Sequence, residues 1–180
     1  MPARSGAQAL VLALGKDGKA YLLDRNNLGG IGGALVSEAV SPAPIRTAPA
    51  GYSIGSESFV AFQGPGARCP LPGRDRGLTV LKITAGSPPA LATAWCGSLR
   101  GAGSPIVTTS DGHSDPIVWI VGAEGDGRLH GFRGDTGEPL FAGGGSKDAM
   151  ADLHHFQTLI AAENRLFVAA DGRVYAFAFE

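Results

Sequence analysis

The sequence predicts an all-β fold built from repeated hairpins, on three observations. Short apolar runs flank Asp-Gly turns at three places. This dipeptide between β-prone runs is a strong hairpin signal, because both residues tolerate a positive φ. Glycine accounts for 28 of 180 residues, about twice its usual share. No stretch of the chain shows the 3.6-residue apolar periodicity of an amphipathic helix.

The three hairpins share one pattern, in which an apolar run, Asp-Gly, a basic residue and a second apolar run follow one another. They join residues 10–14 to 20–23, 117–121 to 129–132, and 166–170 to 174–177. The glycines of the second and third turns, Gly127 and Gly172, lie 45 residues apart. This spacing is typical of a repeat protein.

A degenerate fourth copy fills the long gap between the first two hairpins. Its apolar runs lie at residues 59–62 and 78–83. The connection from Gln63 to Gly77 carries an insertion of about ten residues rich in Gly, Pro and Arg. The chain therefore holds four copies of one unit.

Further apolar runs extend each copy toward four strands. The added runs lie at residues 46–54, 90–95, 106–109, 139–142 and 156–160. The first copy lacks a first strand and the fourth lacks a last one, so we expect about fourteen strands. Four-stranded antiparallel repeats of about 45 residues are the unit of a β-propeller. We predict blades at approximately 1–41, 42–99, 100–145 and 146–180, forming half of an eight-bladed ring or a small four-bladed ring.

Two segments resemble the repeats of the PQQ-like (quinoprotein alcohol dehydrogenase-like) β-propeller family. They are DGRLHGFRGDTGEPLF at 126–141 and NRLFVAADGRVYAFAF at 164–179. The opening ALGKDGKAYLLDRNNLGG at 13–30 is similar to the same repeat in secreted bacterial proteins. The resemblance implies a half-propeller or a C-terminal fragment of a secreted bacterial member.

The same resemblance aligns single positions of the repeat. His130 stands where the family has tyrosine, and Phe141 and Trp95 stand where a docking tryptophan closes a blade. Quinone-dependent members pair the cofactor with adjacent cysteines and a calcium ion, and this chain has no adjacent cysteines. The resemblance therefore implies the fold and not the PQQ cofactor.

Charge and hydropathy exclude several function classes. The formal net charge is −1, from 15 basic and 16 acidic residues, and a nucleic-acid binder needs a basic stripe. The sequence has no polybasic segment of the kind that binds a membrane surface. It also has no apolar run that approaches the length of a membrane span. Residues 1–5 lack the pattern of a signal peptide. The family is secreted or periplasmic, so we expect either a cytoplasmic chain or a truncated form of a secreted one.

Cys69 and Cys96 are the two cysteines, 27 residues apart. One lies in the inserted loop and the other follows the outer strand of the same blade, so both belong to its periphery. We predict a disulfide between them; two separate thiols are the alternative. Two cysteines are too few for a structural zinc site of their own.

The histidines before the fourth blade are the main candidates for a ligand site. His154 and His155 precede an innermost strand, where propeller loops converge on the central channel. Because successive strand residues point to opposite faces, we expect only one imidazole to face the channel. Asp152 would share the side of His154, and Arg100 holds a comparable position before the third blade.

A second polar cluster lies between the first two strands of the third blade. Asp111, His113 and Asp115 stand within five residues, which suits either a polar turn or a bound cation. Calcium or zinc would find further ligands in Asp152, His154 and His155. The alternative for each of these residues is that it is an ordinary polar side chain of a solvent-exposed loop, without a role in binding.

The sequence supports two classes of function. One is a non-catalytic ligand-binding or assembly module, since no Ser/His/Asp trio or nucleophile elbow is present. The alternative is a metal-dependent hydrolase, similar in architecture to propeller lactonases and phosphotriesterases, with a divalent ion at the central channel. The incomplete first and last blades would expose apolar surface, so we expect a homodimer that completes a larger ring.

Overall fold

A computed structural model describes residues 9–74 and 76–179, so residues 1–5, on which the signal-peptide expectation rests, lie outside the described part. The described chain is all-β, and its single helical turn is a short 3-10 segment at Ser146–Asp148. Its fourteen strands are β1 (Leu10–Leu14), β2 (Lys19–Asp24), β3 (Val36–Ala39), β4 (Ala50–Ile54), β5 (Glu57–Gln63), β6 (Gly77–Thr84), β7 (Ala90–Ser98), β8 (Ile106–Thr108), β9 (Ile117–Val121), β10 (Leu129–Arg133), β11 (Pro139–Ala142), β12 (Leu159–Ala162), β13 (Arg165–Ala170) and β14 (Arg173–Ala178). No described helix has the length and apolar character needed to cross a membrane.

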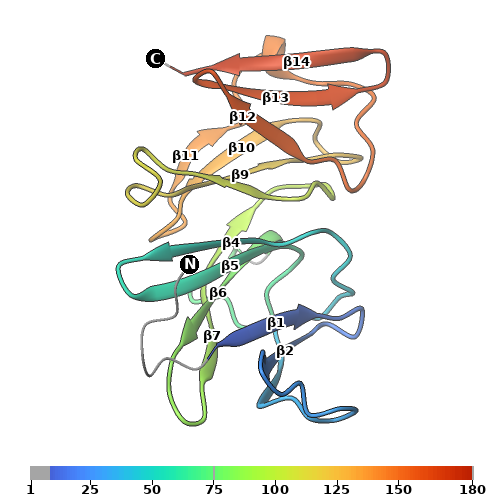
Figure 1. The fold of residues 1–180 in the computed structure, drawn as a ribbon. Helices are drawn as coiled ribbons and strands as arrows, with labels where there is room; N and C mark the ends of the chain where they lie inside the picture. The colour runs from blue at the N-terminus through green and yellow to red at the C-terminus, as the bar shows by residue number, and fades with distance from the viewer. Residues whose placement is uncertain (1–8, 75, 180) are drawn as a thin grey trace.

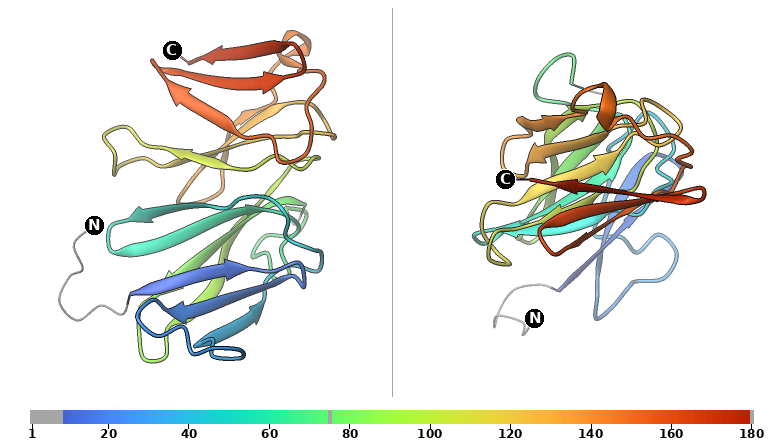
Figure 2. Two further views of the ribbon diagram at one scale, coloured as in Figure 1. Left: turned by 45° about the vertical axis from the view of Figure 1, so that its right-hand side comes forward. Right: turned by 90° about the horizontal axis from the view of Figure 1, so that it is seen from above.

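The strands form four antiparallel sheets in which neighbours in sequence are neighbours in space. Sheet A holds β1–β3, sheet B β4–β7, sheet C β8–β11 and sheet D β12–β14. The sheets stack in chain order, with sheet A at the bottom of the molecule and sheet D at the top (Figure 1). A turned view shows the same order (Figure 2). The predicted count of fourteen strands is confirmed, with three in the first and last sheets.

Two of the three hairpins at Asp-Gly turns, those of sheets A and C, share one local geometry. The carboxylates of Asp17 and Asp126 each accept a hydrogen bond from the backbone N–H two residues later, at 3.2 and 3.1 Å. The side chain four residues later contacts the same carboxylate: the Tyr21 hydroxyl donates to Asp17, and His130 Nε2 lies 3.0 Å from Asp126 Oδ2. His130 is therefore a structural part of the hairpin, in the position that tyrosine holds in sheet A.

Sheets B and C are covered on both faces because alternate strand residues pack on opposite neighbours. In β9, Val118 and Ile120 belong to the apolar cluster shared with sheet B. Trp119 and Val121 belong to the cluster shared with sheet D. A third cluster joins sheet A to sheet B through residues such as Phe62, which is fully buried. Three apolar layers therefore separate the four sheets.

An aromatic residue in the last strand of a sheet packs onto the sheet that follows. The Trp95 indole N–H donates to the Gly134 carbonyl of the β10–β11 turn at 2.8 Å. The Phe141 ring lies 6.4 Å from the Phe177 ring and 5.5 Å from the Phe179 ring. Both aromatic positions that the repeat pattern singled out thus contribute to sheet-to-sheet packing.

Within residues 9–74 and 76–179, no element covers the outer face of sheet A or of sheet D, at opposite ends of the stack (Figure 1). On sheet D, Ile160 and Val174 are each 66% exposed. On sheet A, Val11 is 38% exposed. The described chain is therefore an open stack and does not close into a four-bladed ring.

The start of sheet D departs from the sequence prediction. A strand was expected over residues 156–160, whereas β12 begins at Leu159. Phe156 has a φ of 69°, and the Gln157 N–H donates to the His154 carbonyl at 3.1 Å. These residues form a tight turn, which is incompatible with an extended strand.

Candidate functional site

His154 and His155 lie in the turn before β12, against the β9–β10 turn of sheet C. His155 Nδ1 lies 2.8 Å from Glu124 Oε1, and His154 Nδ1 lies 3.8 Å from the same oxygen. On its other side, His154 Nε2 lies 3.0 Å from Asp171 Oδ2, in the Asp-Gly turn of sheet D. The two imidazoles and two carboxylates, called here the histidine cluster, join three turns at one end of sheets C and D.

The prediction that only one of the two imidazoles faces the channel rested on a premise that does not apply here. It assumed strand alternation, but His154 and His155 belong to the turn that ends at Gln157. In a turn, neighbouring side chains can converge, and both rings here approach Glu124.

Asp152 and Arg100 do not join this cluster. Asp152 Oδ2 lies 3.7 Å from the Arg173 guanidinium. Arg100 interacts with Asp126 through its backbone: its N–H donates to the carboxylate at 3.3 Å, and its carbonyl accepts from the Asp126 N–H at 3.0 Å. The structure therefore brings together His154 and His155 of the four expected rim residues.

Ion pairing sets the charge state of the histidine cluster. The hydrogen bond that the His154 imidazole donates to Asp171, together with the negative charge of that carboxylate, raises the pKa of His154. The hydrogen bond from His155 lowers the pKa of Glu124. Glu124 is consequently ionised at neutral pH.

The loop of Asp111, His113 and Asp115 is a separate feature. Asp111 Oδ1 accepts hydrogen bonds from the N–H groups of His113 and Ser114, at 2.8 and 2.6 Å. These and the Ser114 hydroxyl lower the pKa of Asp111 to about 2. Its carboxylate thus serves the turn itself, as the turn interpretation of the sequence expected.

The candidate metal ligands do not meet in one place. The Asp111 loop precedes β9, whereas the histidine cluster contacts the turn that follows β9, so the two groups lie at opposite ends of one strand. Across residues 9–74 and 76–179, no three His, Cys, Asp or Glu side chains are arranged to hold a metal ion. The two groups of candidate ligands are thus separated by the length of β9.

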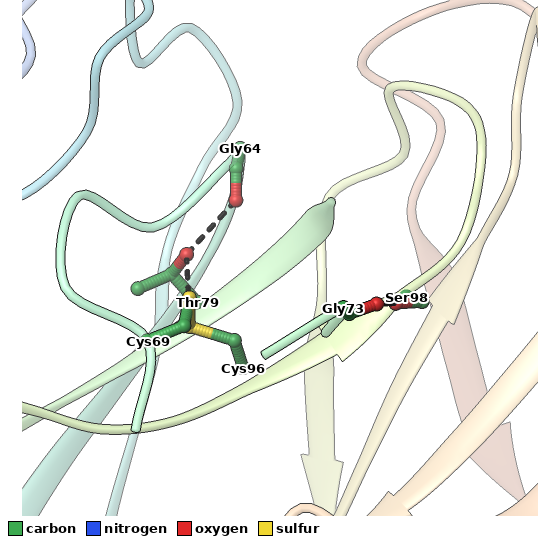
Figure 3. Close-up of a disulfide and its surroundings, with 6 residues drawn as sticks. All are labelled: Gly64, Cys69, Gly73, Thr79, Cys96 and Ser98. Atoms are coloured by element: carbon green, nitrogen blue, oxygen red, sulfur yellow. Dashed lines mark hydrogen bonds between the residues drawn. A yellow bond between two sulfur atoms is a disulfide. The ribbon is translucent and has the colours of Figure 1, made fainter. Parts of the chain in front are cut away.

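The two cysteines form a disulfide at the edge of sheet B (Figure 3). Their sulfur atoms lie 2.01 Å apart and their Cα atoms 5.7 Å apart. Cys96 stands opposite Thr79 in the β6–β7 register. The Ser98 hydroxyl donates to the Gly73 carbonyl at 3.0 Å and ties down the same loop. The inserted loop between β5 and β6 is therefore fastened to the outer strand of its own sheet.

The sequence did not single out Glu124 or Asp171 as site residues. Asp171 was assigned to its hairpin turn, and its contact with His154 depends on the path of the connection between sheets. Glu124 has a φ of 55° in the β9–β10 turn, two residues before Asp126-Gly127, and that dipeptide predicted the hairpin but not a role for Glu124. No local pattern announces either contact.

Comparison with known proteins leaves the fold and the site as the basis for any assignment. No protein-family model matches the chain, and no curated protein matches it significantly.

Proposed function

We propose that this chain is a non-catalytic module of propeller-type repeats, related to the PQQ-like family, that acts by binding and self-assembly. The observation that carries the proposal is the uncovered face at each end of the sheet stack. Burying apolar surface stabilises an assembly by about 25 cal/mol per Å². Two uncovered sheet faces are therefore a driving force for association.

The uncovered face of sheet D is apolar along all three strands. Leu166 and Val168 of β13 point inward and are buried. By alternation, Phe167 and Ala169 lie on the outer face, beside Ile160. This face carries the side chains of Ile160, Phe167, Ala169, Val174 and Ala176, with Arg165 as the charged residue at the start of β13.

The uncovered face of sheet A is the matching surface. Ala20 and Leu22 point inward and are fully buried. The alternate residues Val11, Tyr21 and Leu23 therefore lie on the outer face. Lys19 is the charged residue of β2 on the same side.

A second copy of the chain is the occupant we propose for both faces. Inside the stack, each sheet interface pairs one apolar face with another, and a second copy offers sheet A to sheet D and sheet D to sheet A. A two-fold axis relates the two contacts and closes a ring of eight sheets. The resemblance to the PQQ-like repeat supports the same number, because its dehydrogenases form complete rings of about twice this blade count.

Charged substitutions on the outer faces test the assembly. Ile160→Glu and Val174→Glu, on sheet D, should each give a monomer in sedimentation velocity, and Val11→Glu, on sheet A, should do the same. Leu71→Glu is the matched control, because Leu71 is 51% exposed in the disulfide-bonded loop. Wild-type-like dimers of all three face variants would overturn the proposal.

The hydrolase alternative gains no specific support. Its expected ligands fall into two groups at opposite ends of β9, and His154 and His155 are already paired with carboxylates. We therefore do not propose a metal-dependent reaction.

A further inference from the structure

A cavity of about 540 Å³ opens where the connections between the sheets meet. Its walls come from every sheet-to-sheet connection: residues 43–47 between β3 and β4, Ala102 between β7 and β8, and residues 155–156 before β12. Residues 63–65 after β5 and Glu124 of the β9–β10 turn complete it. This volume lies within the range of small-molecule sites.

The wall of the cavity includes a buried hydroxyl group without a partner. Thr47 is 6% exposed, and its Oγ1 is the one buried side-chain polar atom in the described residues that makes no hydrogen bond. Leaving a buried hydroxyl unpaired costs free energy. Rotation about one bond can exchange the hydroxyl and methyl groups of a threonine, so a ligand in the cavity can give this group a partner.

Phe156 stands at the cavity in a strained and exposed conformation. Its φ of 69° is unfavourable for a bulky residue, and its side chain is 54% exposed. The backbone is held there by the hydrogen bond from its N–H to the Ala102 carbonyl, at 3.1 Å. An aromatic ring is therefore presented to the cavity at a cost in backbone strain.

The cavity walls are fixed by contacts between sheets. Gln63 Nε2 donates to the Gly101 carbonyl at 2.8 Å, which ties sheet B to the connection before sheet C. Glu124 is held by His155 at 2.8 Å. Because these groups are already in place, a ligand would lose little free energy in ordering them.

One cationic and one anionic side chain, Arg46 and Glu124, line the cavity. Arg46 has no salt-bridge partner within the described part of the chain. Glu124 offers a carboxylate whose Oε1 contacts the imidazoles of His155 and His154. A ligand that carries both charges complements the pair, whereas a simple anion or cation meets a like charge.

We propose that the cavity binds a small zwitterion with an apolar body, of the α-amino acid class. Arg46 receives the carboxylate, Glu124 receives the ammonium group, and Phe156 packs against the apolar side chain. The inference rests on the proposed binding function and names its ligand class.

Titration calorimetry with four small molecules tests the charge pattern. L-phenylalanine is the zwitterion, N-acetyl-L-phenylalanine keeps only the carboxylate, 2-phenylethylamine keeps only the ammonium group, and benzyl alcohol keeps neither. We expect L-phenylalanine to bind about tenfold or more tightly than the other three. Equal binding of the N-acetyl compound, or no heat from L-phenylalanine at millimolar concentration, would overturn the inference.

Variants assign the roles of the three side chains. Arg46→Gln and Glu124→Gln should each weaken L-phenylalanine binding about tenfold. Arg25→Gln is the control and should leave binding unchanged, because Arg25 follows β2 and does not line the cavity. Phe156→Gly should weaken binding and raise the unfolding midpoint, because glycine adopts a positive φ without strain. Unchanged affinity in all three cavity variants would contradict the site.

The oligomeric state of the same samples separates this inference from the proposed assembly. A dimer that fails to bind L-phenylalanine removes the ligand site and leaves the assembly intact. A monomer that binds it with the expected charge pattern supports the site and removes the ring.

Discussion

Sheets C and D carry the same hairpin pattern and differ in what covers them. In β9 of sheet C, Val118 through Val121 are all at most 5% exposed, because sheets B and D cover the two faces. In sheet D, Leu166 and Val168 are buried, whereas Ile160 and Val174 are 66% exposed. The repeat motif therefore makes the hairpin, and the position in the stack decides how much free energy each hairpin contributes.

One residue type at two positions should reveal this difference most strongly. Ile120 is fully buried in sheet C, and Ile160 is exposed in sheet D. Ile120→Ala should lower the free energy of unfolding by about 2–5 kcal/mol. Ile160→Ala should change it by less than about 0.5 kcal/mol in the monomer. Urea unfolding at low protein concentration measures both changes. Similar losses for the two variants would contradict the claim that sheet C is covered on both faces and sheet D on only one.

The disulfide should be the next largest contribution, and it belongs to sheet B alone. Closing a loop of this length stabilises a protein by about 3 kcal/mol on the chain-entropy model. The Cys69→Ser/Cys96→Ser double variant should lose about that much. Intact mass before and after reduction checks the bond itself. Two titratable thiols in the native oxidised protein would contradict it.

The two aromatic contacts between sheets sharpen the comparison further. Trp95 joins sheet B to sheet C with a hydrogen bond to Gly134, and Phe141 joins sheet C to sheet D through ring contacts alone. Trp95→Phe should cost about 1–2 kcal/mol, because the Gly134 carbonyl loses a donor while most of the ring packing remains. Chemical denaturation measures this loss. If Trp95→Phe leaves the free energy of unfolding unchanged, the hydroxyl of Tyr52, which also donates to the Gly134 carbonyl, is enough to satisfy that carbonyl.

The smallest expected effect is a pH dependence at the contact between sheets C and D. Asp171, with Glu124 and Asp152 nearby, raises the pKa of His154 above 6.5. This contribution to stability is fully present below the unfolded value and is lost as pH rises through the folded value. The urea midpoint of the wild type should therefore exceed that of His154→Gln by more at about pH 5.5 than at about pH 8.5. A difference between the two urea midpoints that does not change with pH would contradict the ion pair between His154 and Asp171.

The sequence predicted the strands well because each hairpin is marked by a local sequence pattern. Asp17-Gly18 and Asp171-Gly172 lie between apolar runs, and the structure has a hairpin at each. The start of β12 could not be predicted, since the turn at Phe156 depends on a contact with Ala102 from another sheet. Long-range contacts of this kind leave no periodic signal.

The site was predicted only in part for the same reason. His154 and His155 were found because they stand before a strand of the repeat. Their partners Glu124 and Asp171 come from turns 31 and 17 residues away in sequence. Arg46 and Thr47, which line the cavity, were expected at the start of a strand over 46–54, but they lie in the connection before β4, which begins at Ala50. The connections between sheets meet only when the four sheets are stacked, so the sequence of a single repeat does not show which residues they bring together.

The open ends of the stack are the central claim, and the mass of the native protein tests them most directly. Light scattering on a size-exclusion column, across the micromolar range, measures this mass without a label or a variant. The account predicts a species of about 37 kDa, twice the 18.3 kDa of the chain. A stable, monodisperse species of 18.3 kDa at every concentration would contradict it.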